Sequence, residues 1–163
     1  MPVTSSSQDS QALSLTIVTE LAAAPEQVWK VWSDPRLLER WWGPPEWPAT
    51  FTQHEFRPGG SCRYHMTGPE GDEAHGWWNM VAVDAPRRIE LEDGFADQQG
   101  NPDPTFGTGR VVVTLDGIAG GTRLTIASTF ASGEQMDQML QMGMEEGMRL
   151  AMGQIDAVLA EVA

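Results

Sequence analysis

The chain has 163 residues, 40% of them hydrophobic and seven of them tryptophan, which is enough to bury a core and argues against a disordered protein. Its 23 acidic and 10 basic side chains leave a formal net charge of −13, which disfavours binding to nucleic acid or to an anionic membrane surface. The single cysteine, Cys62, excludes an intrachain disulfide, and no apolar run is long enough to cross a membrane. Because residues 1–11 also lack the pattern of a secretory signal, we expect a cytoplasmic protein.

The first part of the chain predicts a loose, flexible polar lead-in over residues 1–11, followed by one domain over residues 12–163. Apolar side chains alternate over residues 13–21, which predicts a half-buried strand. Pro25 suits the first turn of a short helix over residues 24–34. A second short helix follows over residues 34–42 and ends at the proline-rich stretch GPPEWP.

Strand and turn signals continue from residue 49 to residue 130. The expected strands cover residues 49–56, 61–66, 75–84, 87–93, 110–116 and 122–130. Consecutive strands joined by short turns favour an antiparallel sheet. Residues 94–109 form a long loop, which in a compact domain is typical of a functional or mobile segment. Trp77 and Trp78 are adjacent and must point to opposite faces, and the sequence leaves open which of them faces inward.

The last part of the chain has helical periodicity from Ser132 to about Val162, with a predicted capping box formed by Ser132 and Gln135. Gly143 and Gly147 fall on the inward side of this helix, among four of the nine methionines. Two interpretations stay open. In the first, the lack of side chains at the glycines leaves room for a small molecule beside flexible methionines. In the second, the glycines let the helix approach the sheet closely while methionines fill the gaps.

Several stretches, in this order, resemble a known family: RWWGPP at 40–45, RPGGSCRYHMTGPEG at 57–71, GGTRLTIASTF at 120–130 and GMEEGMRLAMGQIDAVLA at 143–160. The chain is similar to the START-like helix-grip superfamily, and within it to bacterial single-domain members of the family named after the activator of the heat-shock protein 90 ATPase. The resemblance implies an α+β fold: a curved antiparallel sheet wrapped around a long C-terminal helix, with two short helices after the first strand. It also implies an apolar cavity between sheet and helix, and it carries no catalytic residue.

The first hypothesis is therefore a domain that binds a small hydrophobic or amphipathic molecule in that cavity, with the loop of residues 94–109 as its gate. The expected lining is Trp42, Phe56, Tyr64, Met66, Trp78, Met80, Phe95, Phe106, Val111, Val113, Leu140, Gly143, Met144 and Gly147.

Two other hypotheses stay open. An enzyme of the polyketide cyclase or hydrolase type would use the same cavity, and two or more polar side chains converging there would favour it. A co-chaperone-like module or a homodimer would instead need a filled interior and an apolar outer patch. We expect no cofactor and no metal, because His54, Cys62, His65 and His75 lack the paired spacing of a chelating site.

Overall fold

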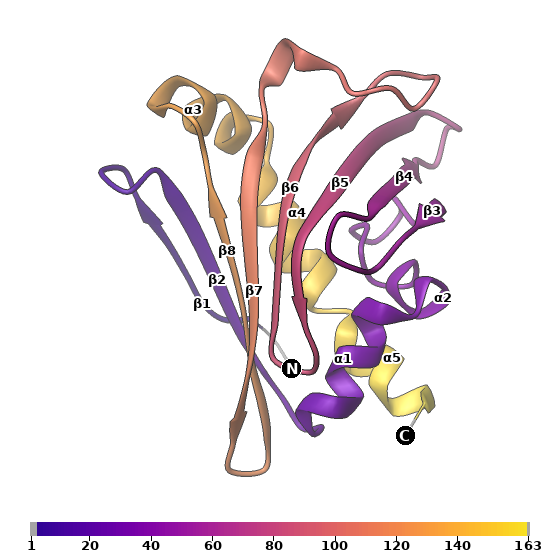
Figure 1. Cartoon of the computed structure of the whole chain (residues 1–163), viewed down its shortest axis with the longest axis vertical. Helices are drawn as coiled ribbons and strands as arrows, with labels where there is room; N and C mark the ends of the chain where they lie inside the picture. Colours follow the sequence, from indigo (N-terminus) through magenta and orange to yellow (C-terminus); the bar gives the residue numbers. More distant parts are fainter. Residues whose placement is uncertain (1–2, 163) are drawn as a thin grey trace.

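The computed structural model describes residues 3–162, apart from the side chains of residues 3, 4 and 106. This part of the chain forms one eight-stranded antiparallel sheet in the order β1-β2-β8-β7-β6-β5-β4-β3. The strands are β1 (Val3–Asp9), β2 (Ser14–Leu21), β3 (Ala49–His54), β4 (Ser61–Thr67), β5 (Glu73–Asp84), β6 (Arg88–Ala96), β7 (Gly109–Ile118) and β8 (Gly121–Thr129). The sheet curves around the C-terminal helices, so the predicted helix-grip fold is confirmed (Figure 1).

The first strand, β1, was not predicted. The expectation of a loose lead-in over residues 1–11 is wrong for Val3–Asp9, which pairs antiparallel with β2 at the edge of the sheet. A polar segment can take this place because an edge strand needs a partner for its backbone and only a small share of the core. The side chains of Ser6 and Gln8 also reach across to Glu145 on helix α4 (Met144–Met152) and donate hydrogen bonds to its carboxylate.

Two short helices follow β2, as predicted. Helix α1 (Pro25–Ser33) begins with Pro25 in its first turn, and α2 (Pro35–Leu38) begins where the Asp34 carboxylate accepts a hydrogen bond from the Arg36 backbone. Helix α2 is shorter than the predicted 34–42, and the chain continues in turns to Trp42. These turns direct Trp41 and Trp42 into the core.

Tryptophans fill the lower part of the space between sheet and helices. Trp41 packs edge-on against Trp32 at a ring-centroid distance of 4.8 Å, and Trp42 packs edge-on against Trp78 at 4.9 Å. Trp78 is therefore the inward member of its pair, while Trp77 lies on the outer face across Gly94. Helix α5 (Ile155–Val162) closes this end of the core and packs on α1.

The C-terminal helical segment is divided into three helices: α3 (Gly133–Gln141), α4 (Met144–Met152) and α5. Ser132 caps α3, since its hydroxyl accepts a hydrogen bond from the Gln135 backbone N–H at 3.1 Å. Between α3 and α4, Gly143 has a φ of +87°, a left-handed conformation that glycine adopts without the strain of a side chain. The single unbroken helix expected over 132–162 is thus bent at a glycine, and α4 crosses behind the sheet while α3 lies beside the upper ends of β2 and β8 (Figure 1).

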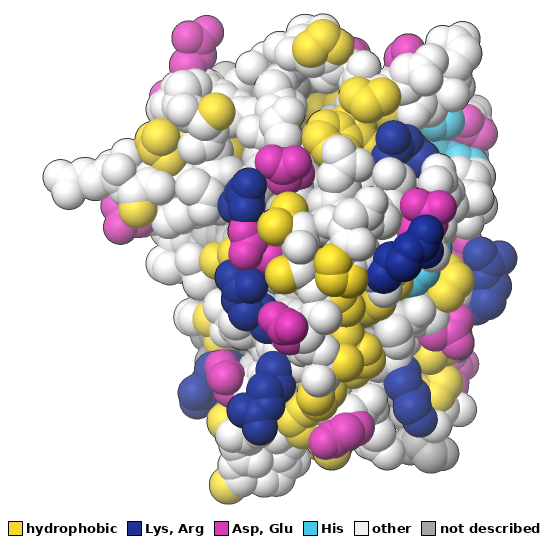
Figure 2. All heavy atoms as spheres, in the orientation of Figure 1, with side chains coloured by type: hydrophobic (Ala, Val, Ile, Leu, Met, Phe, Trp, Pro, Cys, Tyr) yellow, Lys and Arg dark blue, Asp and Glu magenta, His cyan; other side chains and the backbone are white. Residues whose placement is uncertain are grey.

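The outer face of the sheet carries charges of both signs (Figure 2). Glu90 accepts hydrogen bonds from Arg88 and Arg110, and Arg110 also pairs with Glu92 at 3.2 Å. These pairs lie at the surface, with Glu90 partly covered, and each contributes about 1 kcal/mol or less to stability. Because successive side chains of a strand point to opposite faces, the residues of β6 that alternate with these carboxylates, Ile89 and Leu91, face the core.

Candidate functional site

A cavity of about 300 Å³ lies between the upper half of the sheet and helices α3 and α4. It is lined by β-sheet residues, by the loop before β7 and by the two helices. The lining residues are Trp42, Pro44, Tyr64, Met66, Asp93, Gly94, Phe95, Gly107, Gly109, Arg110, Ser128, Thr129, Phe130, Gln135, Met139, Met142, Gly143, Met144, Gly147 and Met148. Most of the side chains are apolar, and five of them are methionines.

The glycines of α4 show why this space stays open. A Cβ atom built at Gly147 would meet no atom of the described residues within 4 Å beyond its own helix and chain neighbours, and the same holds at Gly143. The alternative interpretation, in which the glycines let the helix sit tightly on the sheet, is therefore wrong at Gly147. Helix α4 arches over a hollow, with flexible methionine side chains at its border.

The structure brings together part of the predicted lining. Trp42, Tyr64, Met66, Phe95, Gly143, Met144 and Gly147 line the cavity. Trp78, Met80, Val111 and Val113 point to the same side of the sheet but are buried in the core, where side chains already cover them. The lower half of the inner face is filled by tryptophans and by α5, which alternation along a strand does not reveal.

The remaining predicted residues lie elsewhere. Phe56 is half-buried after β3, where it contacts Trp29 at a ring-centroid distance of 5.6 Å and stacks on His54 at 5.2 Å. Leu140 turns away from the cavity and borders a second, more open hollow with Glu145 and Glu146. Phe106 belongs to η1 (Pro104–Phe106), but its side chain lies outside the described part of the structure.

Asp93 is the polar side chain that the sequence interpretation missed. It continues the inward alternation of Ile89 and Leu91 on β6, and this placement of a carboxyl on an apolar face was the available signal. Asp93 is half-buried in the wall of the cavity, and this burial raises the pKa of its carboxyl to about 6. Its cross-strand partner is Gly109, where a Cβ would lie 2.8 Å from the Asp93 Oδ1, so the glycine makes room for the carboxyl.

Tyr64 lies on the same wall of the cavity, on β4. Burial raises the pKa of its hydroxyl, the Asp93 charge raises it further, and the indole N–H of Trp42 opposes the rise. Tyr64 therefore keeps its proton near neutral pH and serves as a hydrogen-bond donor or acceptor. Ser128 adds a further polar side chain to the lining. The cavity thus combines an apolar body with a few polar groups on the sheet side.

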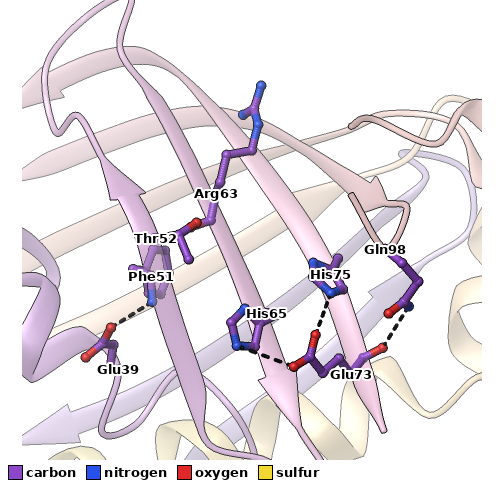
Figure 3. Close-up of polar contacts among 8 residues, drawn as sticks. All are labelled: Glu39, Phe51, Thr52, Arg63, His65, Glu73, His75 and Gln98. Carbon is purple, nitrogen blue, oxygen red and sulfur yellow. Dashed lines mark hydrogen bonds and ion pairs between the residues drawn. The ribbon is translucent and has the colours of Figure 1, made fainter. Parts of the chain in front are cut away.

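The histidines do not contribute to the cavity. His54 Nε2 lies 3.1 Å from the Trp32 carbonyl oxygen, so it is a hydrogen-bonded structural residue, and burial lowers its pKa. On the outer face, Glu73 Oε1 lies 3.0 Å from His75 Nε2, and its Oε2 lies 4.0 Å from His65 Nε2 (Figure 3). No group of three or more His, Cys, Asp or Glu side chains within the described residues is arranged to hold a metal ion. Nor is any helix of residues 3–162 long and apolar enough to cross a membrane.

Comparison with known proteins places the chain in a family. The family model described as activator of Hsp90 ATPase homolog 1-like protein matches residues 22–160. The solution structure of a protein from Arthrobacter aurescens is 53% identical with a TM-score of 0.94, over 98% of this chain and 92% of that one. The crystal structure of a protein from Mycobacterium smegmatis is 45% identical with a TM-score of 0.91, over 97% of each chain.

A more distant structure, from Rhodobacter sphaeroides, is 28% identical with a TM-score of 0.81, over 98% of this chain and 97% of that one. No curated protein matches the chain. Because the family model covers most of the chain and the helix-grip architecture is the same, this protein belongs to the activator of Hsp90 ATPase homolog 1-like family.

Proposed function

We propose that the protein binds a small apolar or amphipathic molecule in the cavity between the upper sheet and helices α3 and α4. The observation that carries the proposal is the unfilled space beyond Gly147, since well-packed interiors leave few voids larger than a water molecule. A volume of about 300 Å³ lies at the lower end of the range for small-molecule sites. Family membership supports the proposal, because the scaffold that it implies surrounds an apolar cavity.

The methionines indicate what kind of recognition such a cavity offers. Met139, Met142, Met144 and Met148 come from the two helices and the turn between them, opposite the more rigid strand residues of the sheet. Unbranched thioether side chains adapt to guests of different shape. The helix side of the cavity therefore suits a guest whose apolar part is recognised by burial and whose orientation depends on the polar groups of the sheet.

The gate was predicted over residues 94–109, but residues 94–96 belong to β6 and Gly109 to β7, so the proposed gate is the loop of residues 97–108. It contributes Gly107 to the lining, and the Gln135 side-chain amide of α3 donates a 3.4 Å hydrogen bond to the Thr108 carbonyl. This contact links the loop to α3 at the border of the cavity. The proposal predicts faster exchange of a bound molecule in Gln135→Ala, measured by NMR line shapes.

The main test fills the cavity from α4. In Gly147→Leu the new side chain would extend into the open space, whereas Gly117→Leu places the same side chain on the exposed far end of β7. A neutral apolar fluorophore, N-phenyl-1-naphthylamine, should bind the wild type and the Gly117 variant and lose most of its affinity for Gly147→Leu. Unaltered affinity in Gly147→Leu, or no binding to the wild type, would contradict the proposal.

A second candidate is an enzyme that uses the same cavity, and the placement of Asp93 favours it. A carboxyl with a pKa of about 6 can accept or donate a proton near neutral pH if the substrate lies within hydrogen-bond reach. Native mass spectrometry of the protein from its own host distinguishes the two candidates. If the protein only binds the co-purified molecule, the mass of that molecule stays the same after incubation, whereas an enzyme converts it to a product of different mass.

An interaction module is supported less well, because the open interior differs from the filled one that this hypothesis requires. Val81 on β5 is an exposed apolar side chain, at 42% of its full accessibility, on the outer face. A homodimer formed through that face stays a prediction, to be tested by the concentration dependence of the molecular mass in solution.

A further inference from the structure

Asp93 is an acidic group with no charged partner in an otherwise mainly apolar wall. No ion pair of its carboxylate is present among the described residues. Arg110 is the one cation among the described lining residues, and its guanidinium is held by Glu90 and Glu92 on the outer face. The Asp93 carboxylate lies in the space that a side chain at Gly109 would take, since a Cβ there would lie 2.8 Å from the Asp93 Oδ1.

We propose that Asp93 is the polar recognition point of the cavity, and that the guest is an amphipathic amine whose protonated amino group pairs with the Asp93 carboxylate. The inference rests on the proposed binding function and names the class of molecule that the same site takes. The apolar part of the amine would lie against the methionines of α3 and α4, and Tyr64 would offer its hydroxyl beside the amino group.

Charge complementarity favours a cation over a neutral or anionic head group. At pH 7 a carboxyl with a pKa of about 6 is mostly ionised, and a half-buried charge in an apolar wall is costly without a partner. A protonated amine removes that cost by forming a charge-assisted hydrogen bond. An anionic head group would add a second negative charge to a site that already holds one.

The segments at the border of the cavity are negatively charged, as Asp93 is. Residues 97–108, which supply Gly107 to the lining, contain Asp97 and Asp103 and no lysine or arginine. Helix α3 contains Glu134 and Asp137 and likewise no basic residue. Together with a net charge of −13, these side chains create a negative potential that attracts a cation to the opening.

The test uses three probes with one alkyl chain and different head groups: octylamine, octanol and octanoate. Binding to the full chain is followed at pH 7 by amide chemical shifts of cavity glycines such as Gly94, Gly109 and Gly147. Asp93→Asn removes the charge while keeping the shape. Asp84→Asn makes the same change at the exposed C-terminal end of the neighbouring strand β5 and serves as the matched control.

We expect octylamine to bind the wild type more tightly than octanol, and octanoate to bind most weakly. Asp93→Asn should lower the affinity for octylamine by about 10-fold to 100-fold, the effect of losing a hydrogen bond to a charged group, and leave octanol unchanged. Asp84→Asn should behave as the wild type.

Equal affinities for octylamine and octanol, or an undiminished affinity for octylamine in Asp93→Asn, would overturn the inference. In either case, cavity shifts that Gly147→Leu abolishes would still support the proposed binding function. If none of the three probes shifts the cavity amides, the binding function itself is contradicted, and the amine inference with it.

Discussion

The two glycines of the α3–α4 region offer a direct test of the local structure, because the same substitution should have opposite effects four residues apart. Gly147 lies inside α4 with helical backbone angles, and a Cβ there meets nothing. Replacing it by alanine removes the helix penalty of glycine, which is about 1 kcal/mol. We expect Gly147→Ala to raise the free energy of unfolding by about 0.5 to 1 kcal/mol.

Gly143 has the same empty surroundings but a φ of +87°. Placing an alanine in this left-handed conformation destabilises the folded state by about 1 to 2 kcal/mol. The substitution also lowers the conformational entropy of the unfolded chain, which offsets only about 0.4 to 1 kcal/mol of this strain. Gly143→Ala should therefore lower the free energy of unfolding by about 1 kcal/mol. The two variants should differ by about 2 kcal/mol, which corresponds to roughly 4 to 8 °C in melting temperature for a domain of this size.

Urea denaturation measures both effects, provided that the slope with denaturant stays constant across the variants. Stabilisation by both substitutions would mean that α3 and α4 form one continuous helix, as the sequence alone predicts. Destabilisation by Gly147→Ala would mean that α4 lies tightly on the sheet, and the argument for an open cavity would then fail.

Three further predictions concern other parts of the structure. Asp93 keeps its proton up to about pH 6 in the folded state but only to about 3.8 when unfolded, so wild-type stability falls as the pH rises between these values. Asp93→Asn should thus be more stable than the wild type at pH 8, by at most about 3 kcal/mol, and equally stable at pH 4, as measured by urea denaturation. In the same assay, Trp41→Phe should destabilise the protein by about 1 kcal/mol more than Trp78→Phe. The Trp41 indole N–H donates a 2.9 Å hydrogen bond to the Val31 carbonyl, whereas the buried Trp78 N–H has no partner among the described residues. Glu145→Ala should speed amide hydrogen exchange in α4, since it removes the hydrogen bonds from β1 that lower the pKa of Glu145; unchanged exchange would show that this link does not restrain the helix.

The local elements of the fold could be predicted from the sequence, because their signals are local. Alternation of apolar and polar residues located β2 and the strands from β3 to β8, and Pro25 and Ser132 marked the starts of helices. The edge strand β1 escaped prediction for a physical reason. Its backbone is satisfied by pairing with β2 rather than by burying an apolar face, so its sequence carries no alternation.

The candidate site could be predicted only in part. Alternation along a strand tells which face a side chain takes, and this correctly assigned Tyr64 and Met66 to the inner face. It does not tell whether another side chain already fills the space in front of that face. Trp78 and Val113 share the inner face of the sheet with Tyr64, yet they are completely buried.

By itself, then, the sequence determined the order of the elements from β2 onward, the antiparallel sheet and the family, since these depend on periodicity and on residues close in the chain. Only the tertiary structure decided where the interior is filled and where it is open, because that depends on side chains from distant elements that meet at one place. Asp93 shows the difference most clearly. Its inward direction follows from β6 alone, but its isolation in an apolar wall arises from Gly109 and from the arch of α4.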